Sequence, residues 1–66
     1  MHLRVNGRPH ELPQGAVLTG LVAALAADPR GIAVAVNGSV VRAAEWSATA
    51  LHEGDRVEVV TARQGG

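Results

Sequence analysis

Large apolar and polar side chains alternate over residues 2–5 and again, less strictly, over residues 8–12. Alternation with a period of two is typical of a strand that buries one face. Asn6-Gly7 separates the two runs, and both residues tolerate the positive φ that a two-residue hairpin turn requires. The chain is therefore predicted to begin with a β-hairpin.

The length of this turn sets the register of the hairpin. Counting outward from the turn gives four opposed pairs: Val5 with Arg8, Arg4 with Pro9, Leu3 with His10, and His2 with Glu11. Leu3, Val5, His10 and Leu12 then share one face, and His2 and Glu11 form a candidate ion pair on the other. Because Pro9 has no N–H for the ladder, the second strand is expected at a sheet edge.

A helical period follows the hairpin. The apolar residues at i, i+3, i+4 and i+7 are Leu18, Leu21, Val22 and Leu25. This spacing predicts one apolar stripe on a helix over residues 18–27. Asp28-Pro29-Arg30-Gly31 is expected to end the helix.

Three more strand patterns occupy the second half of the chain. Residues 32–36 alternate large with small side chains, which predicts a strand that buries Ile32, Val34 and Val36. A second Asn-Gly, at 37–38, turns the chain into a short strand at 40–41. The turn at 53–55 precedes a last strand over residues 56–60, with Val57 and Val59 facing inward. Residues 42–51 are irregular and predict a helical turn or loop, packed by Trp46 and Leu51.

One helix covers only one face of a mixed sheet of this size. The element order therefore predicts an α+β fold of the β-grasp, ubiquitin-like kind. A mixed sheet of four to five strands would wrap around one helix, with the last strand central beside the first and the other face open. We expect one domain over residues 1–66, of which residues 61–66 form an exposed, flexible tail.

Composition narrows the class of protein. The chain has 66 residues and 47% hydrophobic content, but twelve of the hydrophobic residues are Ala. In so small a domain, all of the few large apolar side chains are needed to pack the core, so a deep substrate cavity is not expected. This argues against a self-contained enzyme. There is no Cys and no Lys, and six Arg balance six acidic residues. Neutral charge gives no argument for nucleic acid or a membrane surface, and the absence of a long apolar stretch makes the cytoplasm the expected compartment.

Side-chain chemistry is sparse. His2, His10 and His52 lack metal-ligand spacing, and no Ser or Thr lies in a nucleophile motif. We therefore expect neither a catalytic residue nor a bound metal or cofactor. Trp46, the only aromatic residue, is expected to close one end of the core, although Trp also anchors partner surfaces.

The last four residues of the sequence, Arg63-Gln64-Gly65-Gly66, are the most informative. Gly65 and Gly66 lack Cβ atoms, so an extended chain ending in them can enter a narrow enzyme channel. Such a tail would deliver the α-carboxylate of Gly66, which is a poor acyl donor until ATP converts it to an acyl-adenylate. The catalytic residues would then belong to a partner.

Several short motifs resemble the ThiS family, the sulfur carrier proteins of thiamine biosynthesis. They are Ala33-Val34-Ala35-Val36-Asn37, Val41 with Trp46 five residues on, Glu53-Gly54-Asp55 and the final Gly pair. The family often carries Val-Pro-Arg before the Trp, whereas Arg42 and Ala43 stand at the last two of those positions here. Contacts that the family makes through that Arg are therefore not carried over to this chain.

This resemblance implies a role for each partner. An E1-like adenylyltransferase would use ATP and Mg²⁺ to activate Gly66. A cysteine desulfurase would supply the sulfur that turns the carboxylate into a thiocarboxylate. Thiazole synthase would receive that sulfur, while Arg63, Gln64 and Gly65 thread the tail into these partners.

Strand alternation also predicts which side chains lie on the open face near the root of the tail. They are Arg4, Ala33, Ala35, Glu58 and Val60. Small side chains permit a partner to approach closely, and Arg4 or Glu58 would set its register. The same set also fits an ordinary solvated sheet face.

Other functions fit the same pattern. The tail chemistry is shared with sulfur carriers of molybdopterin and cysteine biosynthesis, and with ubiquitin-like modifiers that form isopeptide bonds. A non-covalent β-grasp binding module with an incidental tail is a third class.

Overall fold

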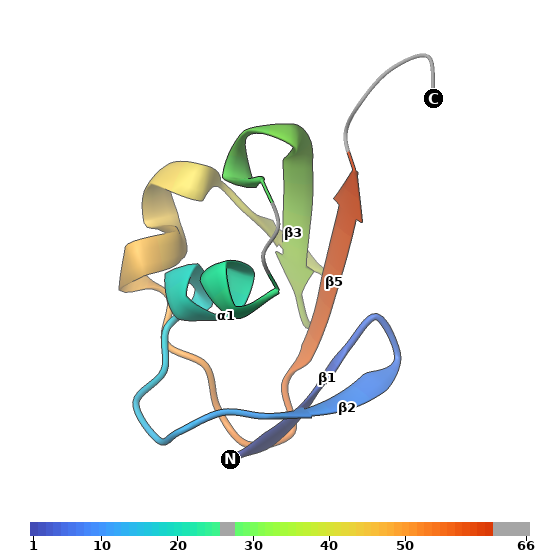
Figure 1. The fold of residues 1–66 in the computed structure, drawn as a ribbon, viewed down its shortest axis with the longest axis vertical. Coiled ribbons are helices and arrows are strands. Elements are labelled where there is room, and N and C mark those ends of the chain that lie inside the picture. The colour runs from blue at the N-terminus through green and yellow to red at the C-terminus, as the bar shows by residue number, and fades with distance from the viewer. Residues whose placement is uncertain (26–27, 62–66) are drawn as a thin grey trace.

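Two layers make up the molecule: a five-stranded mixed sheet, and the helical segments that cover one of its faces (Figure 1). The computed structural model describes residues 1–25 and 28–61. The strands are β1 (His2–Val5), β2 (Arg8–Glu11), β3 (Ile32–Val36), β4 (Ser39–Val41) and β5 (Arg56–Thr61). The helical segments are α1 (Leu18–Ala24) and the 3₁₀ helices η1 (Pro29–Gly31) and η2 (Ala43–Ala48).

The last strand lies in the centre of the sheet. The strand order is β2-β1-β5-β3-β4, with β5 parallel to β1 and antiparallel to β3. This is the arrangement that the element order predicted, and it confirms the α+β, β-grasp fold.

The first hairpin has the predicted register, with Val5 opposite Arg8 and His2 opposite Glu11. Asn6 and Gly7 adopt φ values of 53° and 81° in its turn. His2 and Glu11 are in contact as predicted, with Nε2 and Oε2 3.7 Å apart. Edge strand β2 contains Pro9, as expected for a residue that cannot donate to a ladder.

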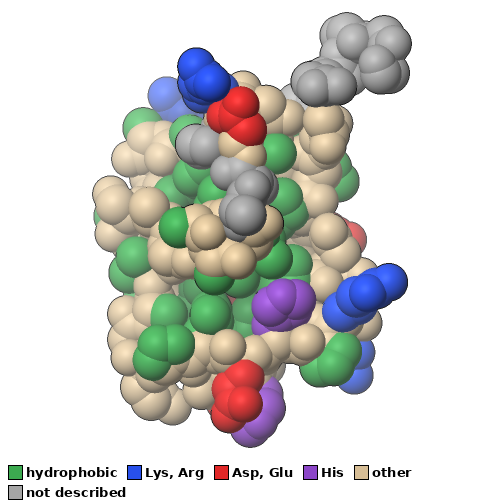
Figure 2. Space-filling model, viewed as in Figure 1, with side chains coloured by type: hydrophobic (Ala, Val, Ile, Leu, Met, Phe, Trp, Pro, Cys, Tyr) green, Lys and Arg blue, Asp and Glu red, His purple; other side chains and the backbone are tan. Residues whose placement is uncertain are grey.

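The core lies between the sheet and its helical cover. Its nine buried residues are Leu3, Val5, Leu18, Leu21, Val22, Val34, Trp46, Leu51 and Val57. Hydrophobic side chains gather around α1 in the space-filling view, and charged side chains lie toward the rim (Figure 2). Trp46 is only 5% exposed, and its indole Nε1 donates to the Val41 carbonyl at 2.9 Å. The interpretation of Trp46 as a core residue is therefore confirmed.

Three local expectations differ from the structure. Ile32 and Val36 are half-buried and only Val34 of that strand is buried, because the seven-residue α1 covers only part of the sheet. The helix ends at Ala24, and residues 26–27 of its predicted range lie outside the described residues. Thr61 does not start the tail, because it pairs with Ile32 and so extends β5 by one residue.

Two Asn side chains extend the pairing of β5. The Asn6 amide behaves like a peptide group toward Val59: Oδ1 accepts from Val59 N–H at 2.8 Å, and Nδ2 donates to Val59 C=O at 3.1 Å. On the other flank, Oδ1 of Asn37 accepts from Arg56 N–H at 2.9 Å. Each Asn-Gly turn therefore also continues its own strand along β5.

The segment before β3 has a capped start. The Asp28 carboxylate accepts from the Arg30 backbone N–H at 3.0 Å and meets the Arg30 guanidinium at 3.3 Å. The backbone hydrogen bond, followed by the guanidinium, holds the pKa of Asp28 below its usual value. This cap leads the chain into β3 without a long loop.

We predict that Asn6→Gly lowers the free energy of unfolding by about 1–2 kcal/mol, because two side-chain hydrogen bonds to Val59 are lost. Gly keeps the positive φ of the turn, so backbone strain does not enter the comparison. Urea unfolding followed by Trp46 fluorescence measures the change. An unchanged midpoint and slope would show that these bonds do not hold β5.

Candidate functional site

The four residues predicted to carry and thread the sulfur, Arg63, Gln64, Gly65 and Gly66, lie outside the described residues. What the structure does describe is the strand that leads to them. β5 runs along the middle of the sheet, with Thr61 as its last residue (Figure 1). The candidate site is therefore built from β5 and the open face beside it.

The C-terminal end of β5 is paired on one side only. Backbone groups along a strand point alternately to its two neighbours. Asn6 satisfies Val59 on the β1 side, where Val57 also accepts from Asn6 N–H at 2.9 Å. Among residues 1–25 and 28–61, no strand lies beside Thr61 on that side. The strand therefore ends with an open backbone edge.

The predicted docking residues lie together on the face of the sheet opposite α1. In the β-ladder, Val60 is opposite Ala33 and Glu58 is opposite Ala35. Arg4 lies on the neighbouring strand β1, on the same face, because the residues on either side of it, Leu3 and Val5, are buried. The two Ala are half-buried, and the other three residues are exposed.

Val40 belongs to this face but was not among the predicted residues. It pairs with Ala35 across β3 and β4 and is 75% exposed, while Val60 is 56% exposed. These two are the large hydrophobic residues that the described part of the chain exposes. The two-residue turn at 37–38 implies the pairing with Ala35, so counting from it would have found Val40.

A row of small and apolar side chains therefore crosses three strands. We call Ala33, Ala35, Val40 and Val60 the apolar strip. At its β5 side, the strip adjoins the charged residues Glu58 and Arg56. Within the strip, Ala33 and Ala35 are small and half-buried, and Val40 and Val60 are exposed.

Two shallow hollows lie next to the strip, on the β1 side. The first, of about 190 Å³, is lined by Arg4, Gly7, Gly38, Arg56, Val57 and Glu58. The second, of about 360 Å³, is lined by His2, Leu3, Arg4, Pro9, Glu53, Gly54 and Arg56.

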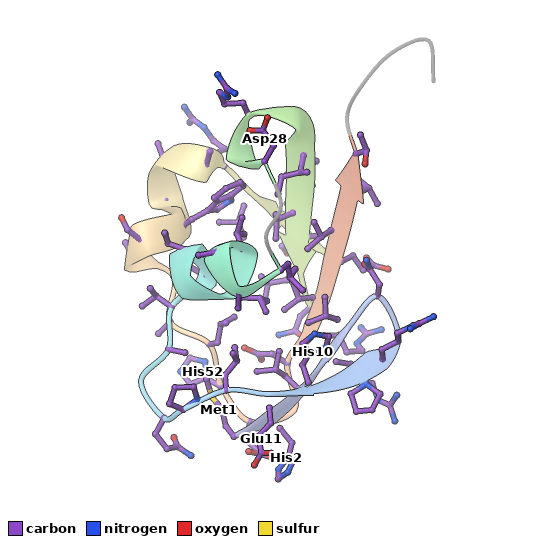
Figure 3. The ribbon with its side chains drawn as sticks, viewed as in Figure 1. Met1, His2, His10, Glu11, Asp28 and His52 are labelled. Carbon is purple, nitrogen blue, oxygen red and sulfur yellow. The ribbon has the colours of Figure 1, made fainter. Side chains whose placement is uncertain are left out.

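The three histidines lie apart (Figure 3). His2 is between two carboxylates, with Nδ1 3.5 Å from Oε2 of Glu53 in addition to its contact with Glu11. His52 lies before β5, with Nδ1 3.8 Å from Oδ2 of Asp55. Within residues 1–25 and 28–61, no three His, Cys, Asp or Glu residues are grouped to hold a metal ion. None of the helices in that part of the chain has the length and apolarity to cross a membrane.

The fold and the open face of the sheet together identify the class of protein to which this chain belongs. Five strands around one helix, with the last strand central and leading directly toward a diglycine, make a ubiquitin-like β-grasp domain. The model of the ThiS family matches residues 3–66, and the chain belongs to that family. The resemblance found in the sequence is confirmed.

Solved structures agree with this assignment. The crystal structure of the thiamine biosynthesis protein ThiS from Geobacter metallireducens superposes over the full length of both chains, with a TM-score of 0.87 and 33% identity. A solution NMR structure of a thiamine biosynthesis protein from the same organism gives a TM-score of 0.80 at 33% identity. That match covers all of this chain and 88% of the other.

A much longer relative is a thiazole synthase from Magnetococcus marinus. It is 38% identical to this chain over all 66 residues. The chain spans only 20% of the length of that protein. A region similar to the present domain therefore occurs within a much longer thiazole synthase chain.

His10 provides a test of how the helix-side face is packed. It lies opposite Leu3 on that face, and its Nδ1 is buried without a hydrogen-bond partner. An unpaired buried polar atom costs stability. His10→Leu is therefore predicted to leave the free energy of unfolding unchanged or to raise it by up to about 1 kcal/mol in urea titrations. A loss of about 1 kcal/mol or more would mean that His10 contributes a favourable interaction.

Proposed function

We propose that this chain is a sulfur carrier in thiamine biosynthesis and that the sulfur travels on the α-carboxylate of Gly66. The observation that carries the proposal is the family match, which covers residues 3–66 and so includes Gly65-Gly66. The position of β5 supports it, because a central strand leads toward these residues from a rigid sheet.

The chemistry has three steps, and partner proteins supply the catalysis. First, a carboxylate oxygen of Gly66 attacks the α-phosphate of ATP, pyrophosphate leaves, and an acyl-adenylate forms. Next, the outer sulfur of a persulfide, which a desulfurase forms from cysteine, attacks the acyl carbon and displaces AMP to give an acyl disulfide. A thiol such as free cysteine then cleaves the S–S bond of this acyl disulfide, releasing the thiocarboxylate and becoming part of a new disulfide with the desulfurase. The product is a thiocarboxylate at Gly66, which gives its sulfur to the thiazole ring under formation.

In these steps, this chain presents its Gly66 carboxylate to the partner enzymes. The E1-like adenylyltransferase binds ATP and Mg²⁺, so the carrier itself needs no cofactor and no catalytic residue. Arg63, Gln64 and Gly65 form the segment that enters each partner, and the absence of side chains at the two glycines permits a narrow entry. The open edge at Thr61 leaves the backbone accessible where that segment begins.

Thiazole synthase is the proposed acceptor of the sulfur. The support is the Magnetococcus marinus thiazole synthase, which includes a region 38% identical to the full length of this chain. A carrier domain joined to the enzyme that uses its cargo is held at a high effective concentration.

The activating enzyme is proposed to dock on the open face through the apolar strip, with Arg4 and Glu58 at its border. The exposure of Val40 and Val60 supports this, because burial of large apolar side chains against a partner is favourable. The half-buried Ala33 and Ala35 between them allow close contact.

The tail chemistry is tested by mass spectrometry. Incubation with the adenylyltransferase, a cysteine desulfurase, cysteine, ATP and Mg²⁺ is expected to raise the mass of the chain by the difference between sulfur and oxygen. Fragmentation should place the change on Gly66. Omitting ATP is the control and should leave the mass unchanged. A mass increase on an internal residue would contradict the proposal.

The docking face is tested with Ala35→Asp and Val60→Asp. Each introduces a charge into the apolar strip and is expected to weaken binding to the adenylyltransferase by about tenfold, or about 1.4 kcal/mol. Ala44→Asp, at an exposed position of η2 in the other layer, is the matched control and should bind like the parent chain. Parent-like affinity of folded Ala35→Asp and Val60→Asp would place the interface elsewhere.

A further inference from the structure

Two arginines stand side by side on the open face. The parallel register of β1 and β5 places Arg4 directly opposite Arg56. Both project away from the core, since Val5 and Val57, the next residues on each strand, are buried. Both are exposed, and both line each of the two hollows on this face. The pair is therefore common to the lining of both hollows.

Neither arginine is neutralised locally. Among the described residues, Arg30 is the arginine that forms an ion pair, with Asp28 in the segment before β3. The nearby acids have other partners: Glu11 and Glu53 lie beside His2, and Asp55 contacts His52 and Asn37. Glu58 shares the face but makes no ion pair with either guanidinium.

Like charges placed opposite each other on adjacent strands disfavour the folded state. Both side chains are exposed on the face away from the core, so placing them side by side adds nothing to core burial. Arg4 donates from Nη1 to the Gly7 carbonyl at 3.1 Å, which orients its guanidinium along the surface. Two neighbouring guanidiniums can bind carboxylates through paired hydrogen bonds.

We propose that Arg4 and Arg56 form a docking site for carboxylate side chains on the surface of a partner protein, and that this partner is thiazole synthase. This inference rests on the proposed function for the choice of partner. The site adjoins the apolar strip, so the complementary surface carries acidic residues beside a small flat apolar area. The charged pair sets the register of the docked partner, while the strip supplies burial.

The test is isothermal titration of the full chain into thiazole synthase from the same source, at about 50 mM and about 300 mM salt. The double variant Arg4→Gln/Arg56→Gln is expected to bind about tenfold more weakly at low salt, and its affinity should depend less on salt. Arg56→Glu should bind more weakly still. Arg42→Gln, an exposed arginine without a side-chain cap bond at the start of η2, is the matched control and should bind like the parent chain.

Thermal unfolding separates docking from folding. Relief of the repulsion between Arg4 and Arg56 predicts that Arg56→Gln, which keeps the hydrogen bond from Arg4 to Gly7, melts at the same temperature as the parent chain or higher. Equal affinities and equal salt dependence for the parent and double variant would overturn the docking site. An equal loss of affinity in the Arg42→Gln variant would also overturn the docking site. Failure of the parent chain to bind at all would overturn the site together with the choice of partner, whereas thiocarboxylate formation at Gly66 is read separately by mass.

Discussion

The backbone pairing of β5 on both flanks is the interaction on which the rest of this structure depends. β3 pairs with the strand from Val57 to Thr61, and β1 pairs with its first two residues, Arg56 and Val57. Where β1 turns away, the Asn6 side chain takes over and binds both backbone groups of Val59. The strand is therefore held from both sides as far as Val59, and Thr61, the last described residue, is paired with Ile32 on one side. A segment presented to enzymes needs such a base.

Much of this fold follows from local pattern. The two Asn-Gly turns, the period-two runs and the stripe from Leu18 to Leu25 predicted the elements, and the first hairpin has the predicted register. The local pattern does not show which contacts form between segments that are far apart in the sequence. The Asn6 amide reaches Val59 only because β5 lies beside β1, and Arg56 meets Arg4 for the same reason. Thr61 joined the strand because β3 begins early enough to pair with it, which depends on the position of η1.

For the candidate site, the sequence predicted most of the residues on the open face but could not establish their roles. Alternation placed Arg4, Ala33, Ala35, Glu58 and Val60 on one face, and the structure brings them together there. Val40 was missed although the turn at 37–38 implies its pairing with Ala35. The roles of these residues in docking, and of Gly66 in chemistry, stay predictions. These roles depend on contacts with other proteins, and such contacts cannot be inferred from the sequence pattern or the fold of one chain alone.

The composition has a consistent meaning within the proposed function. A chain with no Cys can still carry sulfur, since the sulfur is bound to a main-chain carboxylate. A chain with no Lys offers an activated Gly66 no lysine amine of its own to attack it. The most direct test is thiazole formation in a mixture of the adenylyltransferase, desulfurase and thiazole synthase, with the full chain or with a folded variant lacking Gly66. The carrier role predicts no thiazole above the level without carrier for the variant. A yield equal to that of the full chain would contradict it.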